Sequence, residues 1–242
     1  MKKYCLIILI LLSLTINNFA SSEDTVKDLE DILQNATKTT LEYNSELERT
    51  ETGEIKFKVK KANLWLNENP ADKKKLDEFV EITLPGKLYN SQKKIKSVEK
   101  KDVDRSTIEG AITSVFSANK SGDLEWIVEN FIDKDEETIR SIFTENNLEK
   151  NKATAEKITT TYISGEVNYK DSVIVFIEQD YSDRGKMKES LALKKTDKGW
   201  KVTNEFSSDK TFDIVFAAVS TGEVSLKGKE SPKEKSAKDS KS

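Results

Sequence analysis

The residues of this chain that could take part in chemistry are carboxylates and tyrosines in its second half. Glu166 and Glu178 fall within predicted strands, and three tyrosines occur in the same segments: Tyr162, Tyr169 and Tyr181. A carboxylate with a raised pKa that faces a tyrosine can act as a general acid or base. The remaining acids of this region mostly occupy turns or outward strand positions: Asp171, Asp180, Asp183, Glu189 and Glu205. Because charge on a strand usually points to water, we expect Glu166 and Glu178 to be solvated too.

Residue types exclude several other kinds of catalytic centre. The chain has no histidine, and its one cysteine, Cys5, lies in a segment that we expect to be removed. Ser-His and Cys-His pairs, disulfides and the usual zinc sites are therefore excluded from the remaining chain. The sequence also lacks a metal-ligating constellation and a phosphate-cradling glycine loop. We expect a protein that is not an enzyme and that uses no metal or cofactor.

The first 20 residues have the layout of a secretory signal peptide. Lys2 and Lys3 precede the apolar run 5–14, and small residues follow at 20–22. Cleavage after Ala20 predicts an exported protein, either periplasmic or at the cell surface. A retained membrane anchor is the alternative, although the apolar run is shorter than the ~20 residues that a spanning helix needs.

Length and charge limit what the exported part does. About 220 residues suit one large domain or two small ones. The net charge of −3 becomes −5 when Lys2 and Lys3 leave with the leader. This acidic balance gives no electrostatic reason to bind nucleic acid.

We expect residues 21–100 to form a helix followed by a β-hairpin. Apolar residues spaced by three and four place one helical face over 23–49, which favours packing on the protein's own sheet, with a coiled-coil seam as the alternative. Alternation at 55–59 and 80–84 predicts the two strands, the second ending at Pro85-Gly86. The lysine-rich stretch 87–104 is predicted to be a linker or a weakly attached helix, with a domain boundary near residue 100.

Residues 101–220 are expected to form an α+β domain. Ser106 and Glu109 have capping-box spacing, and three short helices follow, the second capped by Asp123. Four antiparallel strands are predicted over 157–169, 172–181, 187–195 and 200–206. The apolar run 212–219 is compatible with a strand or a short helix. Residues 221–242 read as a disordered tail rich in lysine and serine.

This order of elements resembles the NTF2-like superfamily over about residues 101–207. The residues that carry the resemblance are 108–116, 123–131 and Gly199-Trp200-Lys201-Val202. The resemblance implies short helices packed on a curved antiparallel sheet that leaves a cone-shaped cavity. Family members include enzymes, binding modules and assembly domains, so the fold does not settle the function.

Six aromatic residues are candidates to line that cone, although a core needs the same residues. They are Trp126, Phe131, Phe143, Tyr162, Phe176 and Trp200. Together with the leader, these features predict a non-catalytic binding or assembly module of the bacterial envelope, acting on an envelope protein partner or by self-association. The alternative is a binder of small apolar ligands, or a carboxylate-dependent lyase or isomerase, that uses the cavity.

Overall fold

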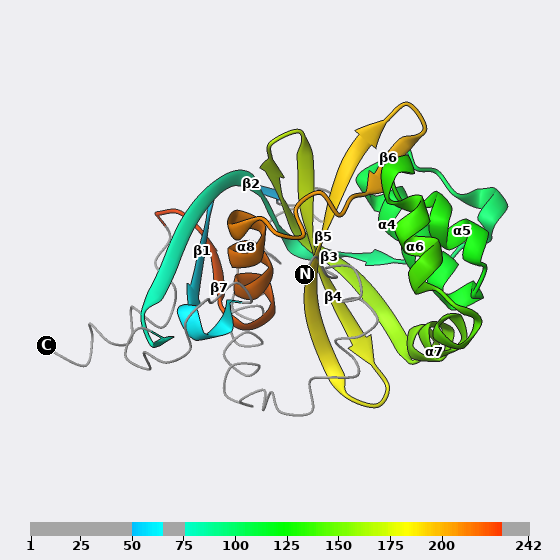
Figure 1. The fold of residues 1–242 in the computed structure, drawn as a ribbon. Coiled ribbons are helices and arrows are strands. Elements are labelled where there is room, and N and C mark those ends of the chain that lie inside the picture. Colours follow the sequence, from blue (N-terminus) through cyan, green and yellow to red (C-terminus); the bar gives the residue numbers. More distant parts are fainter. Residues whose placement is uncertain (1–49, 65–75, 229–242) are drawn as a thin grey trace, which may run out of the picture.

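The computed structural model describes residues 50–64 and 76–228 (Figure 1). The predicted leader (1–20), the predicted helix (23–49) and residues 229–242 of the predicted tail lie outside these ranges. The described part is α+β, as expected, and its centre is a seven-stranded antiparallel sheet in the order β6-β5-β4-β3-β2-β1-β7. The strands are β1 Thr50–Lys60, β2 Phe79–Ile95, β3 Ile158–Tyr169, β4 Ser172–Tyr181, β5 Gly185–Thr196, β6 Gly199–Val202 and β7 Glu223–Leu226.

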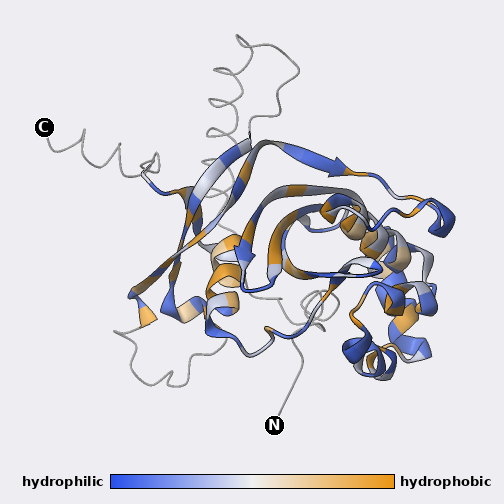
Figure 2. Ribbon diagram, turned by 90° about the horizontal axis from the view of Figure 1, so that it is seen from above, coloured by the Kyte–Doolittle hydropathy of each residue, from blue (hydrophilic) through white to orange (hydrophobic). Residues whose placement is uncertain are grey.

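Helices lie on both faces of this sheet. The α-helices are α4 Ile108–Ser121, α5 Leu124–Glu129, α6 Glu136–Ile142, α7 Glu145–Glu156 and α8 Lys210–Thr221. Three short 3₁₀ helices are also present: η1 Lys61–Asn63, η2 Lys100–Asp102 and η3 Asp133–Asp135. Helices α4 to α7 gather on one side of the central strands, and α8 lies on the other side (Figure 1). Seen from above, the sheet curls strongly between these two groups (Figure 2).

The hairpin is confirmed, and its second strand is much longer than predicted. β1 pairs with β2 from Thr50↔Tyr89 to Lys60↔Phe79. β2 then continues past Pro85-Gly86 and pairs with β3, so the linker interpretation is wrong for residues 87–95. Gly86 permits this close crossing, because a Cβ atom there would lie 2.3 Å from the carbonyl oxygen of Glu166. The hairpin expected within residues 21–100 is therefore continuous with the sheet of the following region.

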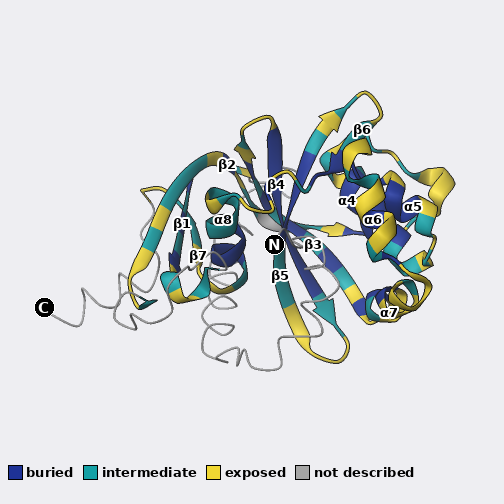
Figure 3. Cartoon of the chain, in the orientation of Figure 1, coloured by how far each residue is buried: buried dark blue, intermediate teal, exposed yellow. Residues whose placement is uncertain are grey.

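Two hydrophobic cores lie on the two faces of the sheet. The helical-layer core joins α4, α5 and α6 to side chains such as Ile163, Ile177 and Leu191. The α8 core joins α8 to β1 and to side chains such as Val167 and Phe176. β3 contributes to both cores because its register with β4 shifts between Ile163 and Gly165, where a bulge reverses which face the following residues occupy. The central strands are correspondingly buried (Figure 3).

The helix termini follow local capping rules, with two corrections. Thr107, and not Ser106, is the N-cap of α4, and its hydroxyl oxygen accepts from the Gly110 amide at 3.0 Å. Asp123 caps α5 as expected. The predicted third helix is two helices, α6 and α7, because the backbone leaves the helical conformation at Phe143.

The four-strand meander is confirmed, and the C-terminal elements were predicted less well. β6 ends at Val202, earlier than the predicted Phe206, because the Asn204 amide donates to Asp135 instead of continuing the strand. The ambiguous run 212–219 belongs to α8, which Asp209 caps. The tail prediction is wrong for residues 223–226, since β7 pairs with Ile55–Lys58 of β1.

Candidate functional site

The candidate site lies at one end of β4 and β5, on the face that carries the helical-layer core. Side chains of a strand alternate between the two faces, so Gln179 and Tyr181 share a face with Ile177. The β4–β5 register runs without a shift and pairs Ile177 with Glu189. Glu189 therefore lies on this same face. We call Gln179, Tyr181 and Glu189 the Gln179–Glu189 group.

Two polar atoms of this group are buried without a hydrogen-bond partner. Tyr181 donates its hydroxyl hydrogen to Oε1 of Gln179 at 2.9 Å, and Gln179 is only 2% exposed. Nε2 of Gln179 and Oε1 of Glu189 are shielded from solvent, and neither makes a hydrogen bond. Most buried polar groups in folded proteins are satisfied, and an unsatisfied one costs about 1–3 kcal/mol. Two such atoms on one face of the sheet need an explanation, and a functional role is one, so the Gln179–Glu189 group is the candidate site.

Burial favours the uncharged forms of Glu189 and Tyr181 near neutral pH. Burial raises the pKa of Glu189 to about 8, and no lysine or arginine of the described residues forms an ion pair with it. Burial, with a smaller contribution from the charge of Glu189, also raises the pKa of Tyr181. The residue Glu189 as a whole is half-buried, so the carboxyl group is shielded mainly at Oε1. A protonated carboxyl can donate and accept hydrogen bonds, and the free Gln179 nitrogen can donate two.

The opposite face at this position carries a second buried carboxylate, Glu178. Glu178 is 4% exposed, so the expectation that it is solvated is wrong. The ammonium groups of Lys186 and Lys188 lie 3.3 and 3.8 Å from its oxygens, and Gln92 donates to Oε2 at 3.3 Å. Two neighbouring cations make a charged carboxylate tolerable in this position. Glu178 is therefore an ion-paired residue of the α8 side and is separated by the sheet from Glu189.

The other predicted carboxylate–tyrosine pairs are rearranged. Glu166 is half-buried and accepts from the hydroxyl of Tyr89 at 3.0 Å, with the Lys87 ammonium 3.3 Å away. Tyr169 donates instead to Asp209, the N-cap of α8. Of the three tyrosines, only Tyr181 shares a strand face with an acid that lacks an ion-pair partner among the described residues, Glu189.

The six aromatic candidates do not share one face of the sheet. Trp126, Phe131 and Phe143 are buried in the helical-layer core, and Trp200 packs half-buried against it. Phe176 belongs to the α8 core on the other face. Tyr162 lies opposite Glu178 on β3 and is half-buried. The structure therefore brings four of them to the helical side and separates the other two from them.

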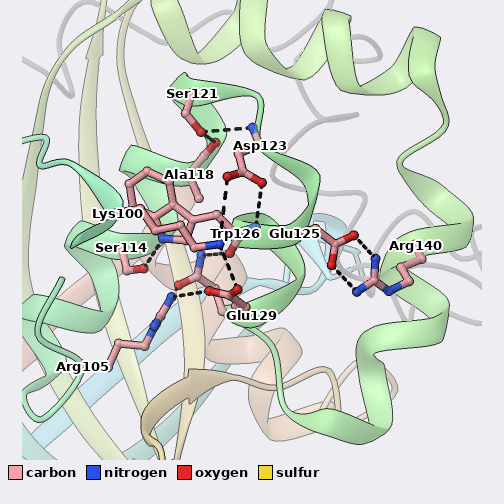
Figure 4. Close-up of polar contacts among 11 residues, drawn as sticks. Lys100, Arg105, Ser114, Ala118, Ser121, Asp123, Glu125, Trp126, Glu129 and Arg140 are labelled. Carbon is pink, nitrogen blue, oxygen red and sulfur yellow. Dashed lines mark hydrogen bonds and ion pairs between the residues drawn. The ribbon is translucent and has the colours of Figure 1, made fainter. Parts of the chain in front are cut away.

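A further set of polar contacts, around α5, fixes the helical layer (Figure 4). Trp126 donates its indole N–H to Ser114 on α4 at 2.9 Å, inside the core. Arg105 donates from Nε to Asn130 at 3.2 Å and lies near Glu129, while burial lowers its pKa. Glu125 and Arg140 form a two-pronged ion pair between α5 and α6 at the surface (Figure 4). These contacts join neighbouring elements and so have a structural role.

Two solved structures are similar to part of this chain. No family model matches the chain. No curated protein matches it either. A solved structure described as an NTF2-like transpeptidase from Campylobacter jejuni is 18% identical and covers 40% of this chain and 97% of its own, with a TM-score of 0.31. A SEC-C motif containing protein from Rhodopseudomonas palustris is 15% identical and covers 42% of this chain and 78% of its own, with a TM-score of 0.32.

Within residues 50–64 and 76–228, no three acidic side chains converge in a way that would hold a metal ion. Over the same described ranges, no helix has the length and apolar character needed to cross a membrane.

Sequence reasoning missed Glu189, although its signal was present. Met187, Leu191 and Leu193 define the inward side of β5, and strict alternation places residue 189 between them. Because a charged residue on a strand usually faces solvent, Glu189 is predicted to point outward, although the alternation of β5 places it inward. Gln179 follows Val173, Val175 and Ile177 in the same way on β4.

Proposed function

We propose that this protein is a non-catalytic binding module that holds a small molecule at the Gln179–Glu189 group. One observation carries the proposal: two buried polar atoms without partners, Gln179 Nε2 and Glu189 Oε1, come from neighbouring strands and lie on one face. A ligand that supplies hydrogen bonds to both would recover the free energy that the two unpaired atoms cost.

Two features favour binding over catalysis. The hydroxyl of Tyr181 is engaged with Gln179, and its pKa is raised, so it is a poor proton donor to a substrate. The chain has no histidine to act as a second acid or base. These features support a group that orients a ligand and leaves its bonds intact.

We place this module in the bacterial envelope, as an exported protein of the NTF2-like type. The leader-like segment 1–20 and the order of helices before an antiparallel meander support this placement. Mass spectrometry of the chain purified from cells tests the export: a first residue at Ser21 is expected, and an intact Met1 would contradict cleavage. Self-association or an envelope protein partner stays a prediction, which the mass in solution tests.

Ligand-detected NMR with a library of small neutral and charged fragments tests the binding function. Fragments that bind the wild-type chain should lose binding in Glu189→Leu. Glu156→Gln is the matched control, because Glu156 is an exposed acid at the end of α7. Equal fragment binding by the wild type and Glu189→Leu would overturn the proposal.

A carboxylate-dependent lyase or isomerase is the second candidate. The observation in its favour is the pKa of Glu189, which burial raises to about 8, close to the range that general acid–base catalysis requires. To distinguish the two functions, the protein is incubated with fragments and metabolite extracts. Mass spectrometry then shows whether any compound is converted. Compounds recovered unchanged support binding, whereas conversion that Glu189→Gln abolishes would establish the enzyme.

A further inference from the structure

We infer that the ligand of the Gln179–Glu189 group presents a neutral head group with an N–H donor beside a carbonyl acceptor, as in a primary carboxamide. This inference rests on the proposed binding function and names the chemistry that the site would recognise. It follows from the hydrogen-bonding capacity that each side chain has left, from their placement and from the charges around them.

Gln179 requires an acceptor from the ligand. Its Oε1 already accepts from the hydroxyl of Tyr181 at 2.9 Å, which sets the orientation of the amide. The group left over is Nε2, which is buried and carries two hydrogens. An amide nitrogen of this kind donates and cannot accept, so a carbonyl oxygen on the ligand is its natural partner.

Glu189 requires a donor from the ligand. Its Oε1 is buried without a partner, and when the proton of the neutral carboxyl is on Oε2, Oε1 is left to accept from N–H. Glu189 is the cross-strand partner of Ile177, and Gln179 lies two residues further along β4 on the same face. Side chains in this diagonal relationship start about 7–8 Å apart at Cα, and both are long enough to converge on one small group. A carboxamide offers its oxygen to one of them and its nitrogen to the other.

The surrounding charges favour a neutral ligand. No lysine or arginine of the described residues forms an ion pair with Glu189, and the guanidinium of Arg184, 4.9 Å from the ring centroid of Tyr181, is already paired with Asp183. An anion would therefore find no free compensating charge there. The adjacent Lys188 faces the other side of the sheet, where it lies beside Glu178. At the turn, Asp183 is bonded to Lys157 and Arg184. A cation would pair with Glu189 but would meet the hydrogens of Gln179 Nε2, so it satisfies only one of the two atoms.

Four probes with the same ring and different head groups test this inference: benzamide, benzoate, benzylamine and toluene. Each is titrated into ¹⁵N-labelled protein at pH 7, and the side-chain NH₂ signal of Gln179 is followed. Benzamide should shift that signal and bind about tenfold or more tightly than the other three, which corresponds to one hydrogen bond of about 1.4 kcal/mol. Glu189→Leu should weaken benzamide binding to the level of toluene.

Conservative and control variants separate recognition from folding. Glu189→Gln keeps an acceptor oxygen and should retain benzamide binding within a few-fold, whereas Gln179→Leu should lose it. A dispersed ¹⁵N spectrum identifies variants that fold, and Glu156→Gln should bind benzamide like the wild type. Stronger Glu189-dependent binding of benzylamine or benzoate would overturn the neutral head group and leave the binding function standing. If no probe bound in a Glu189-dependent way, both the inference and the proposed function would fail.

Discussion

The hydroxyl of Tyr181 donates to Oε1 of Gln179 at 2.9 Å, and this bond determines which end of the buried amide is left over. The free end, Nε2, has no partner, and neither does Oε1 of Glu189 on the neighbouring strand. A fold optimised for stability alone would place apolar side chains here, as it does at Ile177 and Leu191. If these polar groups carry a cost, removing them should raise the stability of the protein.

Replacing Glu189 by leucine should stabilise the protein. Leucine removes a buried carboxyl without a partner and extends the apolar row of Leu191 and Leu193. The expected gain in the free energy of unfolding is about 1–3 kcal/mol, measured by urea denaturation at pH 7. Leu191→Ala is the control and should lose about 2–5 kcal/mol. A loss in Glu189→Leu comparable to that of Leu191→Ala would show that Glu189 is structural.

The stability of the wild type should fall as the pH rises from about 4.5 to about 8. Burial raises the pKa of Glu189 from the ordinary value of 4.5 to about 8, so between these values the folded state holds a proton that the unfolded state has lost. The stabilising contribution of this proton is complete below 4.5 and disappears as the pH passes 8. The slope is at most about 1.4 kcal/mol per pH unit. The difference between the wild type and Glu189→Gln, measured across this range, isolates the effect; a constant difference would contradict it.

Asp209 should be an important cap. Its carboxylate accepts the amide hydrogens of Thr211 and Phe212 at the start of α8 and the hydroxyl hydrogen of Tyr169. Asp209→Ala should lower the free energy of unfolding by about 2 kcal/mol, since it removes the cap and leaves Tyr169 without its partner. Asp209→Asn retains an acceptor and should lose less. Thermal denaturation measures both variants, with Asp197→Ala in the exposed β5–β6 turn as the control; equal melting temperatures for Asp209→Ala and the control would refute the role.

Gly86→Ala should destabilise the junction of the hairpin with β3. A Cβ atom at Gly86 would lie 2.3 Å from the Glu166 carbonyl oxygen and 2.6 Å from Cγ1 of Val167. We expect a loss of about 1–3 kcal/mol in urea denaturation. At Gly53, the nearest atom to such a Cβ is Cδ1 of Leu226 at 3.0 Å, the far end of a flexible side chain. Gly53→Ala should therefore change stability by less, and the reverse order of the two variants would contradict the account.

Local periodicity accounts for the parts of the fold that the sequence predicts well. The alternation of Ile55, Phe57 and Val59 with lysines and glutamate identified β1, because one face of this strand is fully buried. The turn residues at Lys170-Asp171 and Asp197–Gly199 separate consecutive strands, and so they predict an antiparallel meander. For helices α4 and α5, the helical spacing of apolar residues and the capping residues before each segment give the prediction.

Contacts between distant segments account for the rest. β7 is a strand because it pairs with Ile55–Lys58 of β1, a segment far away in the sequence, and its own composition does not reveal this contact. β2 continues beyond Pro85 because Gly86 has no side chain, which lets its backbone lie close to the backbone of Glu166. Phe176 alternates with Val175 and Ile177 on β4 and so faces the α8 core, while the bulge in β3 sends Ile163 and Val167 to different cores. Glu189 was predictable from alternation, and was missed because a charged residue on a strand is usually exposed.

The ionisation of Glu189 tests the central claim most directly. The carboxyl carbon of Glu189, assigned in ¹³C-labelled wild-type protein by comparison with Glu189→Gln, can be followed by NMR from pH 3 to pH 10. The account predicts a titration midpoint near 8, because burial without a cationic partner favours the protonated form. A midpoint near 4.5 would mean that the carboxyl is solvated, and it would contradict the buried, uncharged group on which the proposed function depends.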